Sequence, residues 1–134
     1  MSKRVMHHVC IQTSNYEESL KFYRDIMEFE VISETKGFHG RDFNTWLKLG
    51  DFMIELQTAK SIDVLNKWSP LNEGIVHMCF LVDSVDKEYE RIIKLGYNNF
   101  KVKNGEVIYN VEGGKLFKVK APEGTEIEIR DSKI

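Results

Sequence analysis

Two short histidine-containing segments, repeated about half a chain apart, constrain the fold more than any other feature. His8-Val9-Cys10 and His77-Met78-Cys79 begin 69 residues apart in a chain of 134 residues. Each is followed by an apolar segment with one carboxylate: Glu55 lies 47 residues after His8, and Glu128 lies 51 residues after His77. The spacing predicts two copies of one module related by a pseudo-twofold axis. In such a pair, two imidazoles and two carboxylates converge, and those ligand types suit a divalent metal.

Composition and charge limit which kinds of protein this chain can be. With 42% hydrophobic and 30% charged residues, the chain fits one compact domain, residues 1–134. The net charge of −2 provides no basic field for phosphates, so we expect a small-molecule ligand and no nucleic-acid partner. There is no apolar run of about 18 residues and no secretion signal at the N-terminus, so we expect no membrane span and a cytoplasmic location.

The two cysteines, Cys10 and Cys79, each lie inside an apolar segment of predicted strand. In a reducing compartment such residues behave as small buried hydrophobic side chains. We therefore predict neither a disulfide nor a cysteine zinc site.

The first module, residues 1–59, has the pattern βαβββ. A β-rich segment is followed by Asn15, which can cap a helix that has Glu18 in its third position, the spacing of a capping box. The helix is predicted to end near Met27, and the polar stretch 36–42 is predicted to be a loop. The predicted strands are residues 5–13, 29–34, 43–49 and 52–57.

A connector, residues 60–73, separates the first module from the second, residues 74–134. It contains turn-forming residues, although 62–68 can form a helical turn. In the second module Asp83 or Ser84 caps a helix that Gly96 ends. Its predicted strands are residues 75–82, 98–102, 114–121 and 125–130. The fold class is therefore α+β: two βαβββ modules form curved sheets around a metal-binding concavity.

The alternation of side chains along a strand predicts that the candidate ligands share one face. Val9 and Ile11 point toward the helix, so His8 points to the open side. The same count puts Glu55, His77 and Glu128 on the open side of their strands. Two neighbouring residues could replace these ligands, His7 in place of His8 and Glu126 in place of Glu128. His7 falls on the helix side, whereas Glu126 shares the face of Glu128 and stays an alternative.

Each of these residues alone has an ordinary interpretation. A single histidine in an amphipathic strand is usually hydrogen-bonded or half-exposed, and a single glutamate usually faces solvent. Matched positions in two modules and a shared face favour a metal site, because unpaired carboxylates in a concave apolar sheet are costly.

Several segments resemble the vicinal oxygen chelate superfamily, which includes glyoxalase I, methylmalonyl-CoA epimerase, extradiol dioxygenases, and fosfomycin- and bleomycin-resistance proteins. In that pattern the first ligand directly precedes a V-x-I run, which selects His8, and the last lies six residues after the proline of a P-x-G turn, which selects Glu128. The segments that carry the resemblance are residues 8–15, 19–23, 54–56, 77–83 and 121–129.

The resemblance implies a metal-dependent lyase or isomerase of glyoxalase I type. It would move a proton next to a carbonyl of a small chelated substrate, either a hemithioacetal or a 2-oxo or 2-hydroxy compound. Two residues, Glu128 and Glu55, would be catalytic, and one divalent ion (Zn, Ni, Co, Mn or Fe) would be bound. The metal ligands would be His8, Glu55, His77 and Glu128.

Two positions depart from the pattern of glutathione-using glyoxalases. Those enzymes resemble one another in an arginine four residues after the first ligand and an asparagine four residues after the second. This chain has Gln12 and Ala59 at those positions. The sequence thus leaves the substrate open, and a CoA-thioester epimerase or a dioxygenase stays an alternative.

The competing class is a metal-free protein that sequesters a flat ligand, as bleomycin-resistance proteins do. Trp46, Trp68, Tyr109 and Phe117 are candidates to line such a pocket. In either class we expect a homodimer, because the exposed edges of curved sheets favour pairing. The sequence does not decide whether the metal site lies within one chain or between two, nor whether a loop closes over it.

Overall fold

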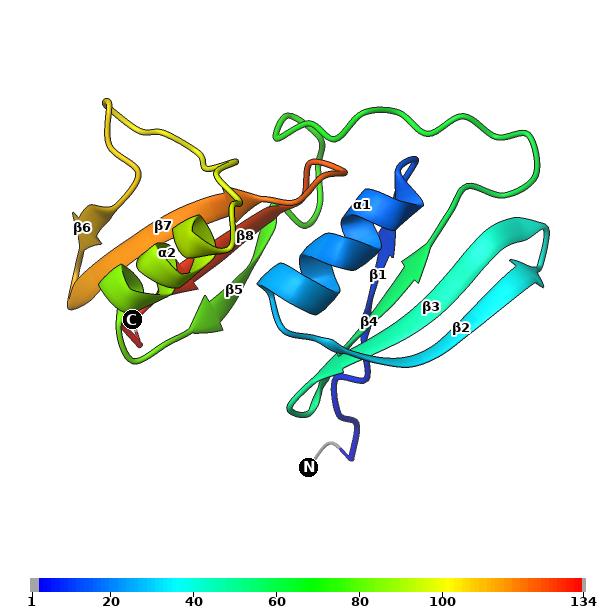
Figure 1. The fold of residues 1–134 in the computed structure, drawn as a ribbon, viewed down its shortest axis with the longest axis horizontal. Helices are drawn as coiled ribbons and strands as arrows, with labels where there is room; N and C mark the ends of the chain where they lie inside the picture. The colour runs from blue at the N-terminus through cyan, green and yellow to red at the C-terminus, as the bar shows by residue number, and fades with distance from the viewer. Residues whose placement is uncertain (1–2, 134) are drawn as a thin grey trace. The chain divides into compact units, whose positions relative to one another are not determined.

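The computed structural model describes residues 3–133 and divides the chain into two compact units, Met1–Lys67 and Trp68–Ile134. Each unit contains one four-stranded mixed sheet and one helical segment (Figure 1). The predicted α+β class, with two βαβββ units, is confirmed.

The sheet of the first unit has the strand order β1-β4-β3-β2. Strand β1 (Val9–Gln12) is parallel to β4 (Phe52–Gln57), which is antiparallel to β3 (Arg41–Leu49). Strand β2 (Glu30–Phe38) forms the outer edge beside β3. The central strands supply the core of this sheet, and Leu47, Ile54 and Leu56 are fully buried there.

The helical segment of the first unit begins as α1 (Tyr16–Lys21) and continues as one π-helical stretch, η1 (Phe22–Ile26). Its apolar side chains are buried, as the helical spacing predicts. The predicted capping box is wrong, because the side chain of Asn15 makes no capping hydrogen bond. Instead, buried Thr13 accepts the backbone N–H of Asn15 at 2.9 Å and shares a hydrogen bond of 2.8 Å with Ser19.

The loop predicted over residues 36–42 is also wrong. Strand β2 continues to Phe38, and a turn at His39-Gly40 leads directly into β3 at Arg41. The predicted strand 29–34 covers only the first part of β2, and every residue of β2 is exposed, so no buried face marks its extension to Phe38. It forms because β3 offers backbone partners along its length, with one shift of register between Val31 and Ser33.

The sheet of the second unit repeats this arrangement in the order β5-β8-β7-β6. Strand β5 (His77–Leu81) is parallel to β8 (Glu126–Arg130), which is antiparallel to β7 (Gly114–Lys120). Helix α2 (Val85–Lys94) lies across this sheet (Figure 1). The predicted cap is present, since the Ser84 hydroxyl accepts the N–H of Lys87 at 3.3 Å. Gly96 follows the helix with a positive φ of 86°, as its role in ending the helix predicts.

The outer strand of the second sheet differs from the prediction. Residues 98–102 form only one isolated bridge, from Phe100 to Val119, and the fourth strand is β6 (Tyr109–Val111). Both segments run beside β7. The chain leaves β7 after Lys101 and returns at Tyr109, so the edge of the sheet is broken into two parts.

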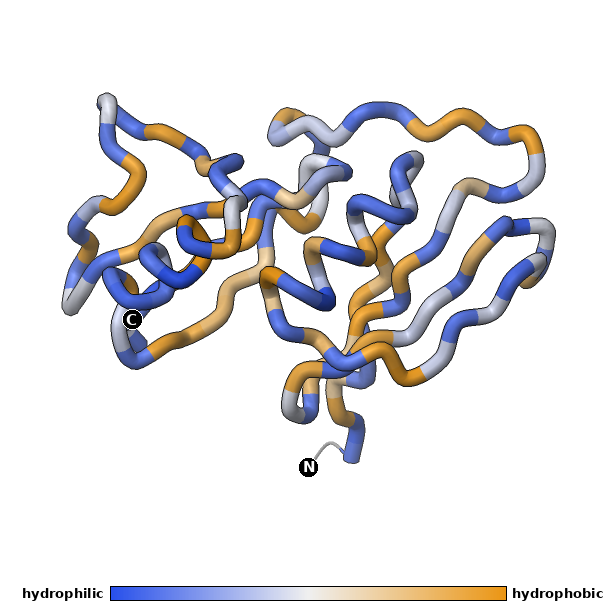
Figure 2. Tube along the Cα trace, in the orientation of Figure 1, coloured by the Kyte–Doolittle hydropathy of each residue, from blue (hydrophilic) through white to orange (hydrophobic). Residues whose placement is uncertain are grey.

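The connector, residues 60–73, has no helix or strand, and the helical turn considered for 62–68 does not form. Lys60 makes a single bridge to Arg41, the first residue of β3. Figure 2 shows short polar and apolar stretches that alternate along the chain. Within residues 3–133, no helix is long and apolar enough to cross a membrane.

Candidate metal centre

In the first unit, the pairing of β1 with β4 brings His8 beside Glu55. Cys10 is the direct partner of Glu55, and His8 lies two residues earlier, on the same face. The His8 Nε2 atom lies 3.5 Å from the Glu55 Oε1 atom. Both side chains remain partly open to solvent, with exposed fractions of 32% and 19%.

Two further aromatic rings surround His8. Trp46 pairs with Glu55 across β3 and β4, and its ring meets the His8 ring edge-on with centroids 4.7 Å apart. The Nδ1 atoms of His7 and His8 lie 2.8 Å apart and share a hydrogen bond. The prediction that His7 points to the helix side is wrong. Strand β1 begins only at Val9, so both histidines precede it and strand alternation does not fix their faces. Their contacts place both rings beside Trp46.

The second unit contains the same pair in the same register. Cys79 is the partner of Glu128 across β5 and β8, and His77 lies two residues earlier on that face. The His77 Nε2 atom is 3.5 Å from the Glu128 Oε1 atom. The exposed fraction is 33% for His77 and 9% for Glu128, so this carboxylate is the more deeply buried of the two.

The side chains that could pair with the charge of Glu128 lie at long distances from it. The Arg130 Nε atom is 3.8 Å from Glu128 Oε2, and the Nδ1 atom of His77 is buried without a hydrogen-bond partner. A charge-assisted hydrogen bond is usually about 2.7 to 2.9 Å long, so these separations are loose. The rival carboxylate, Glu126, is instead held by the Lys101 ammonium at 3.3 Å.

The cysteines correct one expectation, because both Cys10 and Cys79 are exposed rather than buried, and both are free thiols. Each lies two residues after the histidine of its pair and directly opposite the glutamate. Although each residue as a whole is exposed, partial burial of the thiol, followed by the charge of Glu55 and a hydrogen bond to it, raises the pKa of Cys10 to about 11. Partial burial and a hydrogen bond to Glu128 raise the pKa of Cys79 to about 12. Both thiols are therefore neutral at physiological pH.

The four aromatic candidates for a ligand pocket have different surroundings. Phe117 is fully buried in the core of the second unit, which contradicts a pocket-lining role. Trp46 lies beside His8, and Tyr109 lines a pocket at the edge of the second sheet. Trp68 packs against Gly124 so closely that a Cβ at Gly124 would lie 2.7 Å from the Trp68 Cβ.

The separation of the two side chains within each pair is compatible with neighbouring ligands of a divalent metal. Metal-to-ligand bonds of about 2.0 to 2.2 Å place two neighbouring ligands roughly 3 to 3.5 Å apart. Both imidazole-to-carboxylate separations, at 3.5 Å, agree with that range. Within residues 3–133, no three histidine, cysteine or carboxylate side chains gather so that they could hold an ion. Each unit therefore presents one imidazole–carboxylate pair, called its half-site below, and the described residues bring no third ligand to either pair.

Comparison with known proteins assigns the family. The model of the Glyoxalase/Bleomycin resistance protein/Dioxygenase superfamily matches residues 5–129. The uncharacterized protein YwkD of Bacillus subtilis (strain 168) is 31% identical over 97 residues, which cover 72% of this chain and 75% of YwkD.

Solved structures share the fold. A glyoxalase family protein from Enterococcus faecalis is 26% identical, covers 97% of this chain and 99% of its own, and has a TM-score of 0.76. The fosfomycin resistance protein FosX from Listeria monocytogenes, solved with Mn(II) and a sulfate ion, is 16% identical. It covers 100% of this chain and 96% of its own, with a TM-score of 0.69. The chain therefore belongs to the Glyoxalase/Bleomycin resistance protein/Dioxygenase superfamily, the vicinal oxygen chelate group that its histidine and glutamate motifs resemble.

Proposed function

We propose that the protein is a metal-dependent lyase or isomerase of glyoxalase I type. In this proposal His8, Glu55, His77 and Glu128 bind one divalent ion, and the substrate is a small hemithioacetal or a 2-oxo or 2-hydroxy compound. The observation that carries the proposal is the matched pair of half-sites. Each presents an imidazole and a carboxylate 3.5 Å apart, in the same strand register and on the same face of its sheet.

The ligand types support a metal that accepts both nitrogen and oxygen, which includes Zn, Ni, Co, Mn and Fe. The Mn(II) in the FosX structure is consistent with such an ion in this superfamily. When bound, a divalent ion would polarise a substrate carbonyl and so acidify the neighbouring C–H bond.

The residues of this chain supply the orientation and the proton transfer. The imidazoles of His8 and His77 hold the site through their Nε2 atoms. The carboxylate of Glu128 accepts the proton from the carbon next to the carbonyl and returns it to the adjacent carbon. We assign this role to Glu128 because it is the better shielded carboxylate, and shielding from water limits loss of the proton to solvent. Glu55 is the second candidate for the same transfer.

A metal-binding measurement and an activity measurement test the proposal together. The protein is purified without a metal-affinity tag, and its bound metal is determined by elemental analysis. Activity is then measured on a panel of hemithioacetals and 2-oxo and 2-hydroxy acids with each candidate metal. We expect His8→Ala and His77→Ala each to lose metal. We expect Glu128→Gln to lose activity by about a hundredfold or more, the usual scale for a general base.

The chain offers a matched control in Glu126→Gln. Glu126 lies on the same strand and face as Glu128, but its carboxylate is held by Lys101. This variant should keep both metal and activity. Full metal content in a His8→Ala, His77→Ala double variant, or full activity in Glu128→Gln, contradicts the proposal.

The same measurement separates the proposal from metal-free ligand sequestration. A sequestering protein would be purified without stoichiometric metal and would bind its ligand equally well after treatment with a chelator. One observation favours this alternative: Trp46 lies beside His8, and a flat ligand could stack on its ring.

A further inference from the structure

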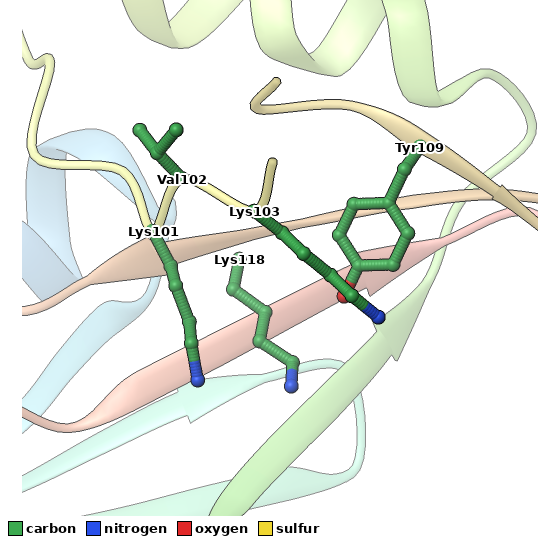
Figure 3. A pocket seen from close by; sticks show the side chains of 5 residues that line it. All are labelled: Lys101, Val102, Lys103, Tyr109 and Lys118. Atoms are coloured by element: carbon green, nitrogen blue, oxygen red, sulfur yellow. The ribbon is translucent and has the colours of Figure 1, made fainter. Parts of the chain in front are cut away.

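The second unit contains a pocket that the metal site does not use. It has a volume of about 310 Å³ and is lined by Lys101, Val102, Lys103, Tyr109 and Lys118 (Figure 3). The pocket exists because the outer edge of this sheet is broken. In the first unit the corresponding edge strand, β2, is continuous over nine residues.

The break in the edge is held open by a tight turn. The backbone groups of Lys103 and Glu106 bond each other in both directions, at 2.9 and 3.0 Å. Asn104 and Gly105 lie between them with positive φ values of 52° and 79°, the geometry that a two-residue hairpin turn requires. The turn carries the chain away from β7 before it returns at Tyr109. The lysines before the turn and the ring after it therefore face one opening.

The three ammonium groups of the pocket are unequally neutralised. Lys101 lies 3.3 Å from the Glu126 carboxylate, which offsets its charge. Lys103 lies over the Tyr109 ring, 4.9 Å from its centre, and has no carboxylate partner among the described ion pairs. Lys118 likewise has no carboxylate within ion-pair distance among residues 3–133. The pocket thus retains about two positive charges. Figure 3 shows the Lys101 and Lys118 side chains extending in the same direction.

The pocket borders the half-site of the second unit. Lys118 on β7 is the direct partner of Glu128 on β8, so the two side chains share one face of the sheet. At the matching position of the first unit, Trp46 is the partner of Glu55. The two modules therefore present the same ligand pair but different neighbours, an aromatic ring in one and a cation in the other.

We propose that this pocket binds a phosphorus oxyanion, the phosphate or phosphonate group of the small molecule on which the protein acts. A dianion matches two uncompensated ammonium groups, and lysine binds phosphate as a point charge. The Tyr109 hydroxyl adds a neutral hydrogen-bond donor. The inference rests on the proposed function only in assigning the anion to the substrate; the binding of the anion itself is independent of the metal.

The test uses the full chain freed of metal with a chelator, at constant ionic strength. Binding of inorganic phosphate, methyl phosphate, methylphosphonate and acetate is measured by calorimetry and by NMR shifts of Tyr109 and Lys103. We expect saturable binding of phosphate and of at least one methyl derivative, with acetate weaker. The comparison of methyl phosphate with methylphosphonate identifies the preferred source of the anion.

Substitutions locate the binding. We expect Lys118→Met and Lys103→Met each to weaken phosphate binding by about tenfold or more, the usual loss for a charge-assisted hydrogen bond. Lys48→Met is the matched control, because Lys48 is an exposed lysine on β3, the strand that corresponds to β7. It should bind phosphate as the wild type does.

Three results would overturn the inference: no saturable phosphate binding, equal phosphate affinity in Lys118→Met and wild type, or acetate binding as tight as phosphate binding. Its failure is distinguishable from that of the proposed function. Phosphate binding that depends on Lys118 in a protein that takes up no metal would contradict the metal site alone. Metal binding without phosphate binding would contradict this pocket alone.

Discussion

At the scale of single residues, we expect His7 to set which nitrogen of His8 is available to the proposed metal. The two Nδ1 atoms lie 2.8 Å apart, so one ring donates and the other accepts. When His8 donates from Nδ1, its Nε2 atom, which faces Glu55, carries the free lone pair that coordination needs. We predict that His7→Phe lowers metal affinity by about 10- to 100-fold, as loss of a partner behind a ligand usually does. Competition with a chelating dye measures that affinity.

The second module supplies the control for this prediction. Val76 precedes His77 as His7 precedes His8, and the His77 Nδ1 atom has no hydrogen-bond partner. Val76→Ala should therefore leave the metal affinity unchanged. Equal affinity in His7→Phe and wild type would show that the bond between the two imidazoles does not set the tautomer.

The ligand residues were open to prediction from sequence, whereas their neighbours were not. Glu55 lies in β4, where a period of two residues fixes its face. His7 and His8 both precede β1, and extending that period back to them gave the right face for His8 and the wrong face for His7. Lys101 and Lys118 meet Tyr109 only because the edge of the sheet is broken, and no local pattern in the sequence reports such a break. The metal role of the four ligands stays a prediction.

At the scale of elements, the two helix starts differ in how they are stabilised. Ser84 accepts a backbone N–H from the first turn of α2, whereas the Asn15 side chain makes no such bond at α1. We predict that Ser84→Ala lowers the free energy of unfolding by about 1 kcal/mol, the typical value of an N-cap. Urea denaturation followed by circular dichroism measures the change.

Asn15→Ala is the matched substitution at the other helix. Because its side chain makes no capping bond, the free energy of unfolding should change by no more than a few tenths of a kcal/mol. If Asn15→Ala lowers the free energy of unfolding as much as Ser84→Ala does, the capping box predicted from Asn15 and Glu18 forms in solution.

The elements that were predicted correctly are those with one buried face. Strand β4 and helix α2 have such a face, and their patterns indicate their type. Strand β2 is exposed along its whole length, and its pairing follows from β3 rather than from its own residues. The short strand β6 is likewise fixed by β7. The strand errors therefore lie in β2 and β6, whose stability comes from the strand beside them.

At the scale of the whole molecule, the proposed metal site takes two ligands from each unit, His8 and Glu55 from one and His77 and Glu128 from the other. Each sheet also has two edge strands, β1 and β2 in the first unit and β5 and β6 in the second. The backbone groups of an edge strand can pair with a strand of another chain. We therefore expect a homodimer. In bacterial glyoxalases, which the sequence resembles, the metal lies between subunits. We expect His8 and Glu55 of one chain to act with His77 and Glu128 of its partner.

Mixing two inactive variants tests this arrangement. One variant carries His8→Ala and Glu55→Ala, and the other carries His77→Ala and Glu128→Ala, so each homodimer lacks half of every site. If the site is shared, a mixed dimer combines the intact pair of each chain into one complete site, and metal binding and activity return after the variants are unfolded and refolded together. If each chain builds its own site, the mixture binds no more metal than its parts. Sedimentation must show that mixed dimers have formed, since a monomer at micromolar concentration that binds metal would itself exclude the shared site.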